Sequence, residues 1–267
     1  LHSTSRRQRQ MCIRDSTKYI FKQVESLGHI ICITTGRPFR MSLDVYRELE
    51  LTSPVINFNG ALISMPNDKN WEHTKSYYID RSFIFDLLRH QQNFNLHFFA
   101  VEYRRKFFLN TFRNVEPKLF GVEKFQPYNR LRADRVTENP HAVLLSTRQK
   151  DKLALAEEMK RHYNGKIDVG VWGGPNGILE VVPKGISKAS GLNHLLKVLD
   201  IPLENLIAFG DEHNDIEMFK LAPNAYAMKN ASARLTPYAS EILPWTMWSD
   251  KSAYLPDGWQ RFSGWYR

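Results

Sequence analysis

A cluster of oxygen-bearing side chains follows a short apolar run in the last quarter of the chain. The run ends at Gly210, within IAFGDEHNDIEMFK. Four such residues follow before a helical pattern begins: Asp211, Glu212, Asn214 and Asp215. Carboxylate and amide oxygens suit a hard cation such as Mg²⁺, which needs only one or two protein carboxylates beside water and phosphate. The same residues also suit the first turn of a helix, so the stretch fits either a metal site or a well-capped helix.

A second candidate for chemistry is the segment Thr34–Arg37, which follows the apolar residues ICI. The hydroxyl of Thr35 and the backbone turn allowed by Gly36 can both donate hydrogen bonds to a phosphoryl oxygen. Thr-Gly turns are common in loops, so this segment indicates phosphate binding only in combination with other groups.

Lys188 is a third candidate because it stands at the start of a predicted helix. A fixed ammonium group can neutralise the charge that develops on a phosphoryl group during its transfer. A cation at a helix N-terminus opposes the helix dipole, which favours a functional reason for its position. The alternatives are a solvated lysine at this position, or Lys184 in the same role.

An alternation of helices and strands positions these candidates. The pattern predicts a helix over 17–27, a strand in HIICITT, a helix over 41–51, and one strand or two in PVINFNGALIS. After Pro183 it predicts a leucine-striped helix over 192–199, a strand in NLIAFG, a helix from about Asn214 and a short strand in AYAMKNA. Such alternation predicts a parallel α/β sheet, in which ligands gather beyond the carboxyl ends of the strands.

The block between these two parts has a different pattern and predicts an inserted α+β domain. We expect helices over 80–94 and 151–163, paired strands in LHFFAVEY and FFLNTF, and strands in KIDVGVWG and ILEVVP around the turn GGPNG. The predicted fold class is therefore α/β, a Rossmann-like core that is discontinuous in sequence and carries an inserted α+β cap. The predicted boundaries are a first core part over 17–66, the cap over 67–178 and a second core part over 179–267.

The composition is that of an ordinary globular protein, with 42% hydrophobic and 24% charged residues. No run approaches the ~18 consecutive apolar residues of a membrane span, and no apolar signal segment is visible. The two cysteines, Cys12 and Cys32, do not make a disulfide framework, so we expect a cytoplasmic setting. The net charge of +9 is scattered over amphipathic segments, so we expect neither nucleic acid nor a membrane as partner.

Taken together, the candidates resemble motifs of the haloacid dehalogenase-like (HAD) phosphohydrolases, specifically the Cof-type subfamily with a subclass IIB cap. Three family motifs have counterparts, the second in ITTGRP with Thr35, the third in GISKASGL with Lys188, and the fourth in GDEHND with Asp211, Asn214 and Asp215. The segments FNGALI, ILEVVPKGISK and AYAMKNA are similar to connecting segments of the subfamily. The resemblance covers residues 17–243.

The resemblance implies a Mg²⁺-dependent phosphatase of small phosphorylated metabolites such as sugar phosphates, which works through an aspartyl-phosphate. Lys188 and Thr35 would take part in catalysis. The residues implied in holding phosphate and substrate are Thr35, Gly36, Arg37, Asn59, Lys188 and Asn214. Asp211 would bind Mg²⁺, and Asp215 would support the ion directly or through water.

The nucleophile motif of the family is absent from its expected position. Family members begin with an apolar strand that ends in DxDGT, whereas this chain begins with LHSTSRRQRQMCIRDS, in which Asp15 lacks both strand and glycine turn. We interpret residues 1–16 as a non-native or artefactual leader joined to a chain whose first strand is lost, and we expect this chain to be inactive. The alternative is a non-catalytic phosphate-binding or interaction protein that lost the aspartate by descent. The far end also departs from the family pattern, with Asp257-Gly258-Trp259 in place of an Asp-Gly-Val turn.

Overall fold

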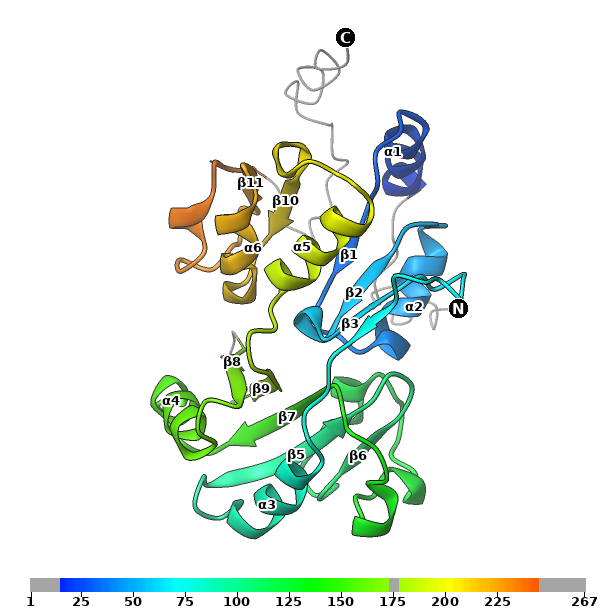
Figure 1. The fold of residues 1–267 in the computed structure, drawn as a ribbon. Coiled ribbons are helices and arrows are strands. Elements are labelled where there is room, and N and C mark those ends of the chain that lie inside the picture. Colours follow the sequence, from blue (N-terminus) through cyan, green and yellow to red (C-terminus); the bar gives the residue numbers. More distant parts are fainter. Residues whose placement is uncertain (1–14, 173–177, 245–267) are drawn as a thin grey trace, which may run out of the picture.

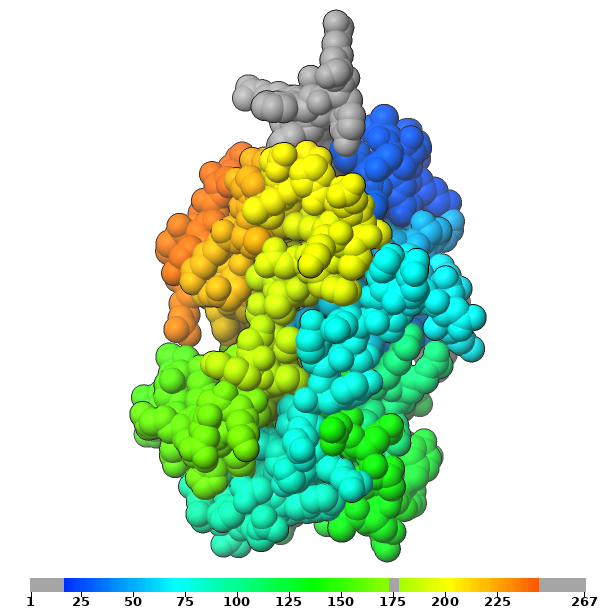
Figure 2. Space-filling view, in the orientation of Figure 1, coloured from blue at the N-terminus to red at the C-terminus, as the bar shows by residue number. Residues whose placement is uncertain are grey.

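Two lobes are built on three β-sheets (Figure 1). The computed structural model describes residues 15–172 and 178–244. One lobe, the core, contains the first and last described parts of the chain, and the other lobe, the cap, is formed by the segment between them. The two connections between the lobes, cyan and yellow-green in Figure 2, run side by side on the face shown. The arrangement agrees with the prediction of an α+β cap inserted into an α/β core.

The first sheet of the core has four strands in the order β1-β2-β3-β4. The elements of this part are α1 (Asp15–Ser26), β1 (Ile33–Thr34), α2 (Phe39–Glu48), β2 (Val55–Asn57), β3 (Leu62–Ser64) and β4 (Lys75–Ser76). β1 and β2 are parallel, whereas β3 and β4 are antiparallel to their neighbours. PVINFNGALIS therefore forms a pair of strands, and HIICITT contributes only the short strand β1.

The second sheet of the core has three parallel strands, in the order β10-β11-β12. The elements of this part are α5 (Lys188–Val198), β10 (Ile207–Gly210), α6 (Ile216–Leu221), β11 (Asn224–Ala227) and β12 (Glu241–Ile242). Leu192 and Leu195 of α5 share one apolar cluster with Ile56 of the first sheet and Ala208 of the second. The core was predicted as one parallel sheet, but the described strands form two sheets, joined by this apolar contact, with β1 and β10 as end strands.

The cap sheet has five antiparallel strands in the order β6-β5-β7-β9-β8. The cap elements are α3 (Ser82–His90), β5 (Leu96–Glu102), β6 (Phe107–Leu109), β7 (Ala142–Thr147), α4 (Lys152–His162), β8 (Ile167–Val171) and β9 (Ile178–Pro183). Successive side chains of a strand point to opposite faces. Phe99, Val101 and Leu179 therefore pack with α3 and α4 on one face. Phe98 and Leu144 lie on the other face, which is turned toward the core (Figure 1).

Some details of the cap differ from the predicted elements. β7 has no predicted counterpart, because its residues AVLLST are a mostly buried run without polar alternation. β9 pairs with β7 and β8, so the cap sheet extends to Pro183, past the predicted boundary at residue 178. The turn GGPNG at 173–177, the leader up to residue 14 and the segment 245–267 lie outside the described residues, while Asp15 begins α1. Within the described ranges, no helix is long and apolar enough to cross a membrane.

Candidate active site

The turn Phe58–Gly60, between β2 and β3, ties the predicted phosphate loop to the start of α5. All three of its residues have positive φ, between 50° and 109°. Such angles are uncommon for a bulky side chain, so the surrounding contacts must enforce them. The backbone N–H of Asn59 donates to the carbonyl of Thr35 at 3.1 Å. A Cβ atom on Gly60 would overlap the carbonyl oxygen of Ser187, so only glycine allows this close approach of α5.

The predicted phosphate loop begins directly after β1. The N–H of Thr35 donates to the carbonyl of Ile56 at 2.9 Å, which continues the pairing of β1 with β2. The hydroxyl oxygen of Thr35 accepts the N–H of Arg37 at 3.1 Å. Gly36 lies against Asn59, since a Cβ atom there would come within 3.0 Å of the Asn59 amide nitrogen. The loop therefore presents a hydroxyl at the carboxyl end of β1, and its glycine allows Asn59 to pack against it.

Lys188 and Asp215 form a buried ion pair at the N-terminus of α5. Lys188 Nζ lies 2.5 Å from Asp215 Oδ1, and the two side chains are only 8% and 4% exposed. Asp215 Oδ2 accepts the backbone N–H groups of Asp211 at 3.0 Å and Glu212 at 3.1 Å. Both oxygens of Asp215 are therefore engaged, and the ammonium charge of Lys188 is held in one position.

Asp211 follows β10 directly and is partly buried. Burial raises the pKa of Asp211, and the negative charges of Asp215 and Glu212 raise it further, whereas Lys188 lowers it. This loop therefore gathers more negative charge than Lys188 balances. A divalent cation with a preference for oxygen ligands, such as Mg²⁺, would offset the excess. The donor set thus fits the predicted ion.

The side chain of Asn59 joins the core to the cap. Its Oδ1 accepts from Asn214 Nδ2 at 3.1 Å, and its Nδ2 donates to Glu180 Oε2 at 2.6 Å. Glu180 lies on β9 and is 2% exposed. Its Oε2 also accepts from Trp172 Nε1 at 3.1 Å, whereas its Oε1 is buried without a hydrogen-bond partner. Burial raises the pKa of Glu180 to about 7, with a smaller contribution from the charge of Glu102, against the hydrogen bond from Trp172.

A cavity of about 160 Å³ lies between the phosphate loop and the core-facing side of the cap sheet. The core contributes Gly36 and Arg37 to its lining, and the cap contributes Glu102, Lys118, Trp172 and Glu180. The charge of Glu102 is already balanced, because its carboxylate forms a bidentate ion pair with Arg40, with N–O distances of 2.6 and 3.1 Å. Polar groups available to a ligand include the buried Oε1 of Glu180, the ammonium group of Lys118 and the guanidinium of Arg37.

The structure brings most of the predicted site residues into one hydrogen-bonded network. Asn59 contacts Thr35 and Asn214, and Asn214 precedes Asp215, which pairs with Lys188 and with the backbone of Asp211. The side chain of Arg37 is exposed at the rim of the cavity.

Glu180 and Trp172 were not predicted. Glu180 is the single acid in the apolar run ILEVVP, which is a signal that the sequence offers. Trp172 directly follows β8, and no pattern in the sequence singles it out.

The sequence profile of the haloacid dehalogenase-like hydrolases matches residues 6–247. The chain belongs to this family. Among curated relatives, 5-amino-6-(5-phospho-D-ribitylamino)uracil phosphatase YitU of Bacillus subtilis is 30% identical over 223 residues, which cover 82% of this chain and 80% of that protein. The family match begins inside the segment predicted to be a foreign leader.

Solved structures of other HAD proteins share the fold. A haloacid dehalogenase-like hydrolase from Bacteroides thetaiotaomicron superposes with a TM-score of 0.70 at 20% sequence identity. The superposition covers 86% of this chain and 87% of that protein's chain. A sugar phosphatase of HAD subclass IIB has a TM-score of 0.70 at 18% identity, over 87% of this chain and 86% of its own. The predicted membership of the HAD family is confirmed, and the fold is that of a subclass IIB protein.

Loss of one partner of the buried ion pair in this HAD chain should destabilise the fold strongly. Replacing Lys188 by Met leaves the Asp215 carboxylate buried without its counter-charge, so we expect a loss of about 3 kcal/mol in the free energy of unfolding. Lys220→Met is the matched control, because Lys220 pairs with Glu217 at 2.8 Å on the surface, where water screens the pair and its loss should cost little. Urea unfolding followed by circular dichroism measures both. Equal losses in the two variants would contradict the assignment.

The buried Glu180 carboxyl should make stability depend on pH. Its pKa is raised from 4.5 to about 7 in the folded protein, which means that folding disfavours its charged form. The free energy of unfolding therefore falls as the pH rises from about 4.5 to about 7. Glu180→Gln keeps an acceptor for Asn59 and Trp172 but does not titrate. We expect the variant to gain stability over wild type by up to about 3 kcal/mol between pH 5 and pH 8.

Urea titrations across this pH range measure the difference between variant and wild type. Glu158→Gln, an exposed position on α4, is the control and should give a constant difference. A difference for Glu180→Gln that is equally independent of pH would show that this carboxyl is not held in an unfavourable charged state.

Proposed function

We propose that this HAD chain carries the phosphate and magnesium side of a phosphomonoester hydrolase for small phosphorylated metabolites. The observation that carries the proposal is the convergence of three loops, after β1, before α5 and after β10, on Asn59 and the Lys188–Asp215 pair. In a parallel α/β architecture, the carboxyl ends of strands are where ligands bind.

Three side chains would hold the phosphate. The Thr35 hydroxyl keeps its proton for donation, because its oxygen is the acceptor in the bond from Arg37. The amide of Asn214 has a second N–H beside the one given to Asn59. Lys188, fixed by Asp215, supplies positive charge where a transferring phosphoryl group needs it. The missing side chain of Gly36 leaves room for the Asn59 amide to lie against the phosphate loop.

Asp211 would hold Mg²⁺ at the end of β10. When bound, the ion would polarise a phosphoryl oxygen and offset its negative charge. Both oxygens of Asp215 are engaged with Lys188 and with backbone N–H groups. We therefore assign Asp215 the role of orienting Lys188 and the loop, and not that of a direct ligand. The Oδ1 of Asn214, buried and without a hydrogen-bond partner, offers a further oxygen in the same loop.

The cavity beneath the cap would take the rest of the substrate. Its volume of about 160 Å³ corresponds to about five water molecules at ~30 Å³ each, so it suits a small organic group. The free Oε1 of Glu180 can accept a hydrogen bond from a substrate hydroxyl, and the ammonium group of Lys118 can donate one. The named relatives are a phosphatase of a phosphorylated ribityl compound and a sugar phosphatase. We propose a sugar or polyol phosphate as the substrate class.

Hydrolysis by the family mechanism also needs a carboxylate nucleophile. Residues 1–16 contain no Asp-x-Asp, and the core strands within the described residues form two sheets in which β1 and β10 are end strands. Both features support the proposal that a nucleophile-bearing strand belongs between β1 and β10. On this proposal the 267-residue chain binds phosphate and Mg²⁺ but does not turn over substrate. A non-catalytic phosphate-binding protein remains the second candidate, favoured by the same absence.

Binding and turnover of the 267-residue chain test the proposal together. Calorimetry should show orthophosphate binding that is stronger with Mg²⁺ present, and Lys188→Met should weaken it by about tenfold or more. Asp211→Asn should abolish the effect of Mg²⁺, whereas Asp200→Asn, an exposed acid after α5, should leave it unchanged. p-Nitrophenyl phosphate should not be hydrolysed measurably.

Each other outcome contradicts a separate part of the proposal. Phosphate binding that is indifferent to Lys188→Met and Asp211→Asn would contradict the assigned site. Magnesium-dependent hydrolysis that Asp211→Asn abolishes would support the phosphatase assignment and refute the requirement for an added strand.

A further inference from the structure

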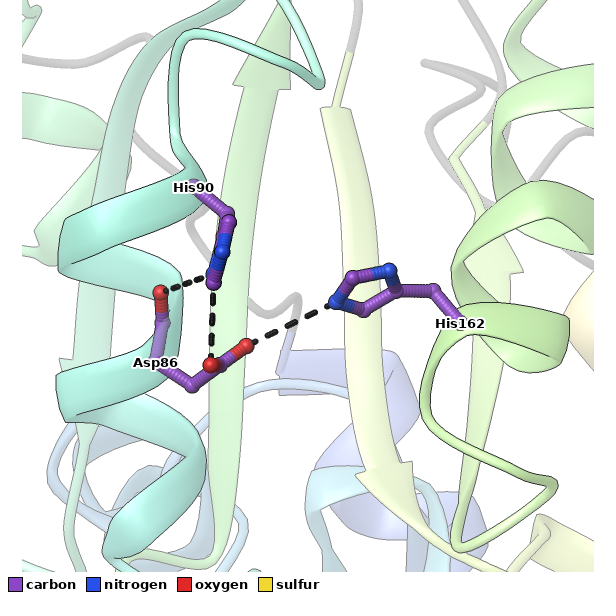
Figure 3. Close-up of side chains that lie close together, drawn as sticks. All are labelled: Asp86, His90 and His162. Atoms are coloured by element: carbon purple, nitrogen blue, oxygen red, sulfur yellow. Dashed lines mark hydrogen bonds and ion pairs between the residues drawn. The ribbon is translucent and has the colours of Figure 1, made fainter.

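We propose that Asp86, His90 and His162 form a binding site for a divalent cation of the zinc class on the cap. Asp86 and His90 are one helical turn apart on α3, and His162 is the last residue of α4 (Figure 3). One ligand atom from each residue lies within 4.8 Å of the other two. The site lies on the helical face of the cap sheet, opposite the face that lines the substrate cavity (Figure 1), so it is separate from the proposed magnesium site.

The spacing of the three side chains suits tetrahedral zinc. Zn–N and Zn–O bonds of about 2.0–2.1 Å place neighbouring ligand atoms of a tetrahedron about 3.3 Å apart. His90 Nδ1 lies 3.2 Å from Asp86 Oδ1, and His162 Nε2 lies 3.7 Å from Asp86 Oδ2. Figure 3 shows the carboxylate between the two imidazoles. Small side-chain rotations therefore bring all three ligand atoms onto one ion.

The chemistry of the ligands selects the class of metal. Two imidazoles with one carboxylate favour Zn²⁺ and its neighbours among the transition metals, whereas Mg²⁺ favours oxygen ligands. The side chains of His90 and His162 are 36% and 41% exposed, so an ion can reach them and water can complete its coordination. Asp86 Oδ2 is buried and makes no close hydrogen bond, but the hydroxyl of Tyr163 lies beside this carboxylate, so a cation would bind in competition with that hydroxyl.

The competing account is a network of ion pairs without a metal. Arg89 Nη2 lies 3.3 Å from Asp86 Oδ1, and the Nδ1 of His90 also lies 3.0 Å from the carbonyl oxygen of Asp86. These contacts hold α3 together locally, but neither reaches α4. His162 faces the carboxylate from the other helix at 3.7 Å, beyond hydrogen-bond distance. A bound ion would convert this loose approach into a link between the ends of α3 and α4.

Zinc binding to the full chain tests the proposal. After chelator treatment, with millimolar Mg²⁺ present throughout, the wild type should take up one Zn²⁺ per chain and its Tm should rise on zinc addition. Co²⁺ in place of Zn²⁺ should give visible absorption typical of tetrahedral coordination. His162→Gln should weaken zinc binding by more than about tenfold and remove the Tm rise.

Two further variants keep the test specific. His73→Gln is the matched control, because His73 is 35% exposed beside the single carboxylate of Glu72 at 3.8 Å, and it should retain wild-type binding. Asp211→Asn should also retain binding, which separates this site from the magnesium loop. Zinc uptake that is equal in wild type and His162→Gln, or absent from both, would overturn the proposal, with circular dichroism confirming that each variant is folded.

Discussion

The side chain of one asparagine, in a left-handed turn, links the phosphate-binding side of the candidate active site to the cap. The amide of Asn59 accepts from Asn214 in the core and donates to Glu180 in the cap. Asparagine suits this position because it tolerates positive φ better than most residues and offers a donor and an acceptor on one side chain. The cap strand β9 and the loop after β10 are therefore held in register by two hydrogen bonds to the same residue. The phosphate group at the core loops and the rest of the substrate in the cavity would therefore lie on opposite sides of Asn59.

The residues around Asn59 are arranged at some cost to stability. Lys188 and Asp215 are buried as charges, Glu180 is buried with one oxygen unpaired, and the turn Phe58–Gly60 holds three residues at positive φ. Unpaired buried groups and strained backbone are found most often where a protein binds or reacts. The magnesium ion that we propose at Asp211 would relieve part of this cost by balancing the carboxylates of its loop.

The sequence predicted where the candidate site residues of the core stand better than the sheets that support them. Thr35, Lys188 and Asp211 were named because each follows a strand or begins a helix, and the structure confirms these positions, which can be read from local patterns. The division of the core into two sheets follows from long-range strand pairing, which local patterns do not encode. Glu180 was missed for a similar reason, since an acid in an apolar run gains its meaning only when the fold brings it to Asn59. The end of the cap at Pro183 depends on the pairing of β9 with β7 and β8.

The central claim is that three separate loops converge on one phosphate, and anomalous diffraction from crystals soaked in tungstate and Mg²⁺ tests it most directly. Tungstate has the shape and charge of a phosphate and scatters strongly. The account predicts one tungsten site, with its oxygens about 3 Å from Lys188 Nζ, the Asn214 amide and the Thr35 hydroxyl. It also predicts that the site disappears in crystals of Lys188→Met. Tungstate bound only elsewhere, for example beside Lys118 in the cap, would contradict it.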